Sequence, residues 1–333
     1  MQPLGPGDPQ QLGPFRLLGR LGSGGMGHVY LGRGADGRTV AVKVLRLDLH
    51  AGQEAEFRRR FASEVSAARA VDEAFTARVL DADPNAEVPW LATTFIPGLT
   101  LGTAVERRGP LPEGTLRHLA RGLVVALRGI HAAGLVHRDL KPSNVMLAVE
   151  GPRVIDFGVS LVPDASRLTR SGHAVGTLGF MAPEQLEGAY GPASDVFAYG
   201  AVVAFAATGR PPFGRGTFAE VLGNMTLREP DLTGLPTAYR GLVSACLAKR
   251  PEDRPPVGAL LDGIPNSGAH AVDPPRAELD ARWLPTELAH DILAIAVQAL
   301  DAARDTGIHQ IPVQAGPPPR PAGLPATVGR ADR

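Results

Sequence analysis

Short runs of alternating apolar and polar residues, broken by glycines, fill the first part of the chain. A period of two is the pattern of half-buried β-strands, and the turn residues between runs mark where strands end. The stretch Ala35-Asp36-Gly37 carries a hairpin-turn signal between two of these runs. The pattern therefore predicts three antiparallel strands over residues 15–21, 28–33 and 39–45, and two further strands over residues 79–81 and 90–95.

Helical periodicity replaces this alternation elsewhere, with apolar residues returning every three or four positions. Residues 54–71 predict one helix, and beyond residue 97 the chain is mostly helical. The clearest helix covers residues 112–133 and is followed by Gly134 as a candidate C-cap. Further helices are expected over residues 194–208 and 239–249. The apolar face of the helix over residues 54–71 is formed by Phe57, Phe61, Val65 and Ala68. That of the helix over residues 112–133 is formed by Leu116, Leu119, Leu123, Leu127 and Ile130.

This order of elements predicts an α+β protein of two lobes. The small lobe, residues 15–96, would combine an antiparallel sheet with one helix. The larger lobe, residues 97–263, would be mainly helical. We find no internal repeat that would indicate a solenoid or an array.

The two ends of the chain have a different composition. Residues 1–14 are rich in Pro, Gly and Gln and predict a flexible leader. Residues 264–333 form a Pro/Ala-rich tail, interrupted by an amphipathic helix near residues 285–304. That helix either packs on the helical lobe, which its alanine-rich stripe favours, or binds a partner or a second copy of the chain.

Composition and charge limit the classes of function. The 333 residues carry a formal net charge of +0, so no basic field favours nucleic acid or an anionic membrane, and no nucleic-acid partner is expected. The single cysteine, Cys246, excludes an intramolecular disulfide and a cysteine-rich zinc site, which fits the reducing cytoplasm. No run approaches the roughly 18–20 apolar residues of a membrane helix. We therefore expect a cytoplasmic domain without a membrane segment in this chain, while a longer parent chain could contain one.

A glycine-rich segment follows the first predicted strand, with Gly22, Gly24 and Gly27 at G-x-G-x-x-G spacing. Glycine lets the backbone approach phosphate oxygens because no Cβ stands in the way. The spacing alone is a weak signal in a chain with forty glycines, and an ordinary glycine-rich turn would also explain it. A dinucleotide-binding fold would place a helix after the motif, but Val29 and Tyr30 continue as a strand, which favours a hairpin over ATP phosphates.

Lysine is scarce, since the chain has three lysines among 34 basic residues. Lys43 ends an alternating strand, sixteen residues after Gly27, and its retention favours an inward ammonium that holds phosphate over a solvated surface lysine. An inward lysine needs an anion to orient it. Glu64 is the candidate, because it lies at the edge of the apolar face of the following helix, whereas Glu54 and Glu56 lie near the helix start, where acids favour the dipole anyway.

The strongest signal is a series of motifs in fixed order. Residues His137-Arg138-Asp139-Leu140-Lys141-Pro142-Ser143-Asn144 resemble the catalytic loop of protein kinases, H-R-D-L-x-x-x-N. Over residues 15–263 the chain resembles the eukaryotic-type (Hanks-type) bacterial serine/threonine protein kinases, and is most similar to actinobacterial members. The other segments that carry this resemblance are Asp156-Phe157-Gly158, Met181-Ala182-Pro183-Glu184, Asp195-Val196-Phe197-Ala198-Tyr199-Gly200 and Arg254 in Pro251-Glu252-Asp253-Arg254-Pro255.

The resemblance implies a bilobal protein-kinase fold that transfers the γ-phosphate of ATP to Ser or Thr hydroxyls of proteins, with Mg²⁺, or alternatively Mn²⁺, as metal cofactor. It implies Asp139 as the proton acceptor, Lys141 as the contact to the γ-phosphate, and Lys43, oriented by Glu64, as the contact to the other phosphates. The metal would be held by Asn144 and Asp156. The implied nucleotide-binding residues are Leu21, Gly22, Ser23, Gly24, Gly25, Met26, Gly27, His28, Val29, Ala41, Lys43, Thr93, Thr94, Ile96 and Met146, with Thr93 resembling the gatekeeper.

Regulation is partly predicted by the same resemblance. Arg138 beside Asp139 resembles the mark of a kinase whose activation loop is ordered by phosphate. Thr169 and Ser171 are the candidate autophosphorylation sites, and Thr177 is expected to contact Asp139 and Lys141. Phe180 and Phe197 replace the usual tyrosine and tryptophan of the family. Both substitutions keep an aromatic body and lose a polar group, so we expect altered packing rather than altered catalysis.

Two other classes of function stay open at this point. A pseudokinase scaffold would have lost a metal-binding or base residue, and none is lost. A small-molecule phosphotransferase would lack the A-P-E segment and its arginine partner, which build a platform for protein substrates. The expected partners are therefore protein substrates, with a second copy of the chain, phosphorylated in trans, as an alternative.

Overall fold

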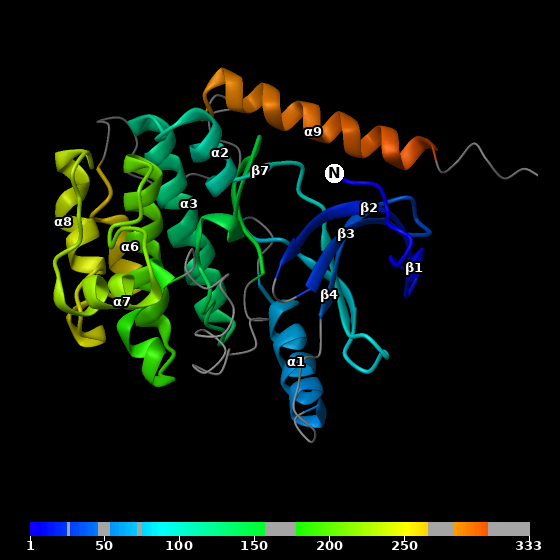
Figure 1. The fold of residues 1–333 in the computed structure, drawn as a ribbon, viewed down its shortest axis with the longest axis horizontal. Helices are drawn as coiled ribbons and strands as arrows, with labels where there is room; N and C mark the ends of the chain where they lie inside the picture. The colour runs from blue at the N-terminus through cyan, green and yellow to red at the C-terminus, as the bar shows by residue number, and fades with distance from the viewer. Residues whose placement is uncertain (25–26, 46–53, 72–74, 157–177, 266–282, 306–333) are drawn as a thin grey trace, which may run out of the picture.

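The computed structural model describes residues 1–24, 27–45, 54–71, 75–156, 178–265 and 283–305, and every structural statement below refers to these residues. The chain folds into two lobes (Figure 1). The predicted α+β architecture of two lobes is confirmed. Several predicted positions lie outside the described residues, namely Gly25, Met26, Phe157, Gly158, Thr169, Ser171 and Thr177.

The small lobe is built on one sheet in which every pair of neighbouring strands is antiparallel. A small apolar cluster that includes Tyr30, Val42 and Trp90, all buried, lies on the face of the sheet opposite to Val29 and Lys43. The strand order is β1-β2-β3-β4-β6-β5, with β1 Gln11–Leu12, β2 Phe15–Gly24, β3 Gly27–Arg33, β4 Thr39–Leu45, β5 Val79–Asp83 and β6 Trp90–Thr94.

Helix α1, Glu54–Ala68, lies beside this sheet (Figure 1). Its buried residues are Phe57, Phe61, Val65 and Ala68, the four positions of the predicted apolar face. These side chains belong to the large core that continues into the other lobe. The register of apolar residues thus fixes which face of α1 turns inward, and with it the direction of Glu64.

Residues 1–14 do not form the flexible leader that their composition suggests. Strand β1 pairs with β2, and Gln2 forms a bridge with Arg20. The Asp8 carboxylate, only 4% exposed, accepts hydrogen bonds from the guanidinium of Arg20 and the hydroxyl of Tyr30, both across the sheet, and from the backbone N–H of Gly5. Composition missed this segment because it is held by one buried carboxylate and by backbone pairing rather than by an apolar stripe.

The larger lobe is mainly helical. Helix α6, Pro192–Thr208, is buried along nearly its whole length and forms the centre of this lobe. A small sheet, β7 Leu99–Thr100, β8 Val145–Ala148 and β9 Gly151–Val154, borders the small lobe. The surrounding helices are α2 Leu101–Arg108, α3 Glu113–Ala132, α7 Phe218–Leu227 and α8 Thr237–Cys246, with short 3-10 turns at Pro142–Asn144, Pro183–Glu187, Pro251–Asp253 and Val257–Leu261.

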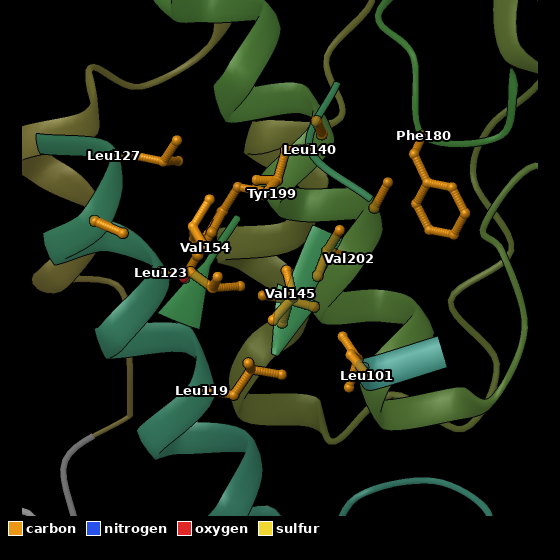
Figure 2. Close-up of a cluster of buried hydrophobic side chains, with 14 of the residues drawn as sticks. Leu101, Leu119, Leu123, Leu127, Leu140, Val145, Val154, Phe180, Tyr199 and Val202 are labelled. Carbon is orange, nitrogen blue, oxygen red and sulfur yellow. The ribbon is translucent and has the colours of Figure 1, made fainter. Parts of the chain in front are cut away.

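Figure 2 shows how the core fixes the catalytic segment. Leu119, Leu123 and Leu127 of α3 point toward Val145 of β8 and toward α6. Leu140, from the middle of the catalytic loop, is buried in the same cluster. Because Leu140 is anchored in this core, the polar residues on either side of it are held in place.

A last helix, α9, covers Thr286–Asp305 and runs across the molecule from α2 to the side of β2 (Figure 1). Its first half packs on the helical lobe, as the sequence favoured, and its second half also reaches the small lobe. Within the described part of the chain, no helix is long and apolar enough to cross a membrane.

Candidate active site

The backbone of the catalytic loop is held by one buried carboxylate. Asp195, in the first turn of α6, is 1% exposed and accepts hydrogen bonds from the backbone N–H of His137 (2.8 Å) and of Arg138 (2.9 Å). His131 on α3 lies 2.8 Å from the same carboxylate. A carboxylate at a helix N-terminus is also favoured by the helix dipole. These bonds fix the loop at His137 and Arg138, where the backbone bends at a positive φ.

That bend has a local conformational cost. Arg138 has a φ of 68° and Asp156 a φ of 61°, and within the described residues these are the non-glycine residues with positive φ. Side chains rarely adopt this left-handed region, and such strain persists where the surroundings fix it. Both residues belong to motifs that the sequence singled out, so the backbone strain lies within the two motifs.

The loop brings three predicted catalytic residues together. The ammonium of Lys141 lies 2.8 Å from Oδ2 of Asp139. The side-chain amide of Asn144 donates to the backbone carbonyl of Asp139 (2.8 Å) and to its Oδ2 (3.1 Å). Both side-chain contacts use Oδ2 of Asp139. Within the described residues, its Oδ1 therefore remains available to accept a hydrogen bond from a substrate hydroxyl. A carboxylate that is held and oriented in this way can accept a proton from such a hydroxyl.

The expected ion pair between Lys43 and Glu64 is not the arrangement found, which corrects the prediction. The Lys43 ammonium lies 3.1 Å from Oδ2 of Asp156, and Glu64 instead accepts a hydrogen bond of 2.8 Å from the guanidinium of Arg138. Burial raises the pKa of the Glu64 carboxyl, while Arg138 and Arg60 act in the opposite direction. A half-buried carboxylate needs a cation, and the longer, planar guanidinium of Arg138 reaches it from the other lobe.

The predicted nucleotide residues come from both lobes. Val29 is opposite Lys43 across β3 and β4, and Ala41 is opposite Thr93 across β4 and β6. Met146 lies on β8 of the larger lobe, beside the connection at Gly98, where an added Cβ would come 3.2 Å from its Cε. All five side chains are half-buried. Leu21, His28, Thr94 and Ile96 are also half-buried, and Ser23 is exposed.

The glycine-rich hairpin fits a phosphate-binding role. Gly22 is opposite Val29, and Gly24 is opposite Gly27, whose φ of 137° suits glycine. A Cβ added at Gly22 would meet no atom of the described residues within 4 Å. Contacts within the described part of the chain therefore do not require glycine at this position, whereas close approach of a phosphate would.

The residues present also fit a hard divalent cation. Asn144 uses its amide nitrogen on Asp139, and its amide oxygen accepts one long hydrogen bond of 3.5 Å from the Ser143 hydroxyl, so a second lone pair remains for a cation. Asp156 supplies a carboxylate. Two such oxygens together with phosphate oxygens are a typical ligand set for Mg²⁺. No group of three or more His, Cys, Asp or Glu within the described residues forms a self-contained metal site. A cation here would therefore depend on the nucleotide for its remaining ligands.

A second ion pair, between Glu184 and Arg254, lies in the larger lobe. Glu184 and Arg254 form a bidentate pair with distances of 2.7 and 2.9 Å, and Ser194 donates a third hydrogen bond to Glu184. Burial alone would raise the pKa of Glu184, but the bonds from Arg254 and Ser194 outweigh it and lower the pKa. Arg254 also stacks over Phe197, 4.9 Å from the ring centre. The phenylalanine that replaces the family's tryptophan thus keeps its packing role.

Sequence reasoning missed two residues that position the loop. One is His131, described above, and the other is Gln185, which donates to the backbone carbonyl of Arg138 (2.9 Å) and accepts from the backbone N–H of Ala182 (2.8 Å). Gln185 directly follows the A-P-E motif and is 4% exposed. A polar residue next to a motif gives little signal of its own, because its burial is decided by the tertiary fold.

These features define a protein kinase, and the chain belongs to the protein kinase domain family, whose model matches residues 15–263. The chain is 53% identical over 262 residues to the probable serine/threonine-protein kinase PkwA of Thermomonospora curvata, covering 78% of this chain and 35% of that protein. It is 49% identical over 250 residues to the serine/threonine-protein kinase AfsK of Streptomyces coelicolor, covering 74% and 31%. The chain thus spans about a third of the length of these relatives.

A solved structure shows the same fold. The crystal structure of the PknI kinase domain of Mycobacterium tuberculosis aligns with a TM-score of 0.60 at 26% sequence identity. The alignment covers 75% of this chain and 94% of that domain. Proteins of this family in general use ATP and a divalent metal.

Proposed function

We propose that this chain is a serine/threonine protein kinase domain that transfers the γ-phosphate of ATP to hydroxyls of protein substrates. The observation that carries the proposal is the cluster of Asp139, Lys141 and Asn144, with Lys43 and Asp156 beside it. Phosphoryl transfer needs positioning and charge neutralisation more than covalent help from the protein. The cluster offers both, because a proton acceptor and two cations lie close together.

In the proposed mechanism, Asp139 accepts the proton of the substrate hydroxyl and aligns the oxygen for attack. Lys141 stabilises negative charge on the transferred group, and Lys43 holds the remaining phosphates. Asn144 and Asp156 would hold Mg²⁺, with Mn²⁺ as an alternative, and a cation there would neutralise charge on the phosphate oxygens. The Asp-Leu-Lys sequence of residues 139–141 supports Ser and Thr as acceptors, as in the relatives named above.

The ion pair of Glu184 with Arg254 supports proteins as the substrates. Small-molecule phosphotransferases of similar core lack this pair, and here it is buried and bidentate. A second copy of the chain is one such substrate, with Thr169 and Ser171 as the proposed autophosphorylation sites. The buried thiol of Cys246 and the use of ATP support a cytoplasmic setting for the domain.

The first test is mass spectrometry of the intact chain and its peptides after incubation with ATP and Mg²⁺, comparing the native chain with Asp139→Asn. We expect phosphate on the native chain only, because the amide cannot accept the hydroxyl proton. Asp36→Asn, in an exposed hairpin turn, is the matched control and should gain phosphate like the native chain. Phosphate on Asp139→Asn at the native rate would reject Asp139 as the proton acceptor, and no phosphate on the native chain would favour a scaffold.

A further inference from the structure

The segment from Trp283 to Ala303 lies outside the residues matched by the kinase family, yet it contacts both lobes. Figure 1 shows α9 as one straight helix that passes over α2 and ends beside β2. A helix of 20 residues is about 30 Å long, which is the width of a small domain. One rigid element thus reaches from the large lobe to the small one.

The N-terminal end of this segment, near Trp283, is firmly anchored on the large lobe. Trp283 is 3% exposed, and its indole N–H donates to the backbone carbonyls of Ala148 and Val149, both at 3.1 Å. The hydroxyl of Thr115 on α3 donates to the backbone carbonyl of Trp283 at 2.8 Å. Leu288, with 1% of its surface exposed, packs in the same core. This end is therefore an extension of the large lobe.

Charges reinforce that anchor. The guanidinium of Arg108, at the C-terminal end of α2, pairs with Asp291 through three hydrogen bonds of 2.9–3.1 Å and with Glu287 through one of 2.9 Å. Two-pronged arginine–carboxylate pairs are stronger and more directional than single contacts. Glu287 also lies in the first turn of α9, where an acid favours the helix dipole. Arg108 thus sets the direction in which α9 leaves the lobe.

The C-terminal end of α9, near Ala303, has fewer contacts with the small lobe. The guanidinium of Arg33, at the end of β3, donates to the backbone carbonyl of Ala303. The last four carbonyls of a helix lack partners within it, so Arg33 satisfies one of them and also complements the negative end of the dipole. Ala299 and Ala303, each 7% exposed, are the buried residues at this end, and α9 packs there against β2. Alanine side chains bury little apolar area, so the contact of α9 with the small lobe is weaker than its anchor on the large lobe and can open first.

We propose that α9 is a brace that fixes the orientation of the small lobe over the large one and so positions the nucleotide residues over the catalytic loop. This inference rests on the proposed function, since the two sets of residues must meet around one nucleotide. Strand β2 carries the first half of the glycine-rich hairpin, and Arg33 ends β3, which carries the second half. A tether at these strands restricts the freedom of the hairpin relative to Asp139 and Met146. Preorganisation of this kind appears as tighter nucleotide binding.

The test compares two arginine substitutions on the same helix. Ala303→Arg places a long cation in the buried contact and against Arg33, whereas Leu300→Arg changes a residue that is 56% exposed. We expect Ala303→Arg to raise the Kd for a fluorescent ADP analogue and the KM for ATP by about 3- to 10-fold, with kcat at saturating ATP changed less than about 2-fold. Leu300→Arg should behave as the native chain does.

Hydrogen exchange on the same proteins reports the brace directly. In Ala303→Arg the amides of the second half of α9 should lose protection, while those near Trp283 and Leu288 keep it. Equal nucleotide affinity and equal protection in the two variants would overturn the proposal. If Ala303→Arg does not fold, Arg33→Met decides, because it removes the contact from the other side, and an unchanged Kd would again reject the brace. A native chain that binds the ADP analogue but transfers no phosphate rejects the proposed function alone, since the Kd comparison still judges the brace.

Discussion

At the residue scale, the partners of Glu64 and Lys43 are the main result. Both residues were found from the sequence, but their pairing was not, because a sequence shows which charges exist and not which distance each can close. Glu64 lies on an element of one lobe and Arg138 on the other, so their contact depends on how the lobes meet. One oxygen of the Glu64 carboxylate and the Nε of Arg138 are buried without a hydrogen-bond partner among the described residues. This half-satisfied pair is suited to exchange partners.

We predict that Arg138 competes with Lys43 for Glu64 until the activation loop carries phosphate. A phosphoryl group adds about −1.5 to −2 charge and pairs well with arginine, which would free Glu64 to move to Lys43. In Arg138→Gln the gain in activity on autophosphorylation should therefore shrink by about 5-fold or more, the low end for coupling of this kind. The measurement is the rate of peptide phosphorylation before and after preincubation with ATP.

Arg59→Gln is the matched control for that experiment. Arg59 is an exposed cation on α1, the helix that carries Glu64, and does not contribute to the pKa shift of the Glu64 carboxyl. It should keep the activation ratio of the native chain. An Arg138→Gln variant that is still activated to the native extent would show that Glu64 is released by another route.

At the scale of elements, apolar periodicity correctly predicted the positions of helices and strands and the faces that they bury. The four buried residues of α1 and the stripe of α3 follow from their spacing, and the strands of the small lobe lie where alternation placed them. The segment before Phe15 was wrongly expected to be flexible. Its placement depends on the Asp8 carboxylate, which finds Arg20 and Tyr30 on two neighbouring strands. A single acid in a Pro- and Gly-rich stretch carries no periodic signal, so its burial could not be read from the sequence.

The Asp8 contacts predict a specific dependence of stability on pH. The backbone N–H of Gly5, then Arg20 and Tyr30, lower the pKa of Asp8 from 3.8 to about 2. Since the folded-state pKa lies below the unfolded one, the stabilisation is fully present above the unfolded value and is lost as the pH falls from about 4 to about 2. Asp8→Asn should have a lower Tm than the native chain at pH 7 and a smaller loss of Tm between pH 4 and pH 2.

Thermal unfolding followed by circular dichroism across this pH range makes the measurement. Asp36→Asn provides the control, because Asp36 is 61% exposed and an asparagine oxygen can still accept its 3.0 Å hydrogen bond from the backbone N–H of Arg38. Its pH profile should follow that of the native chain. Parallel profiles for the native chain and Asp8→Asn would mean that the Asp8 contacts do not hold the segment in solution.

At the scale of the whole molecule, the folded unit is larger than the kinase domain as the family defines it. One continuous core includes Leu45 and Phe61 of the small lobe, Leu123 of the large lobe, and Trp283 and Leu288 beyond residue 263. Domain boundaries were predicted from a change in composition, which places residues 264–333 in a tail. Composition cannot reveal that one tryptophan in that tail completes the core, because its burial depends on a surface that other elements build.

This view makes the last prediction, that Trp283→Ala destabilises the kinase domain itself. Trp283 is 3% exposed and gives up two hydrogen bonds to the β8–β9 turn on truncation. Substitution of a buried tryptophan by alanine costs about 3–5 kcal/mol, so the free energy of unfolding in urea should fall by that amount. Leu293→Ala, on the outward face of α9 and 52% exposed, should change it by less than about 0.5 kcal/mol. Equal unfolding midpoints for the two variants would mean that the cooperatively folding unit ends before residue 283.

A large loss of unfolding free energy for Trp283→Ala alone would make the segment from Trp283 onward part of the fold. The proposed brace requires this, because α9 can fix the orientation of the small lobe only if its own first half is firmly part of the large lobe.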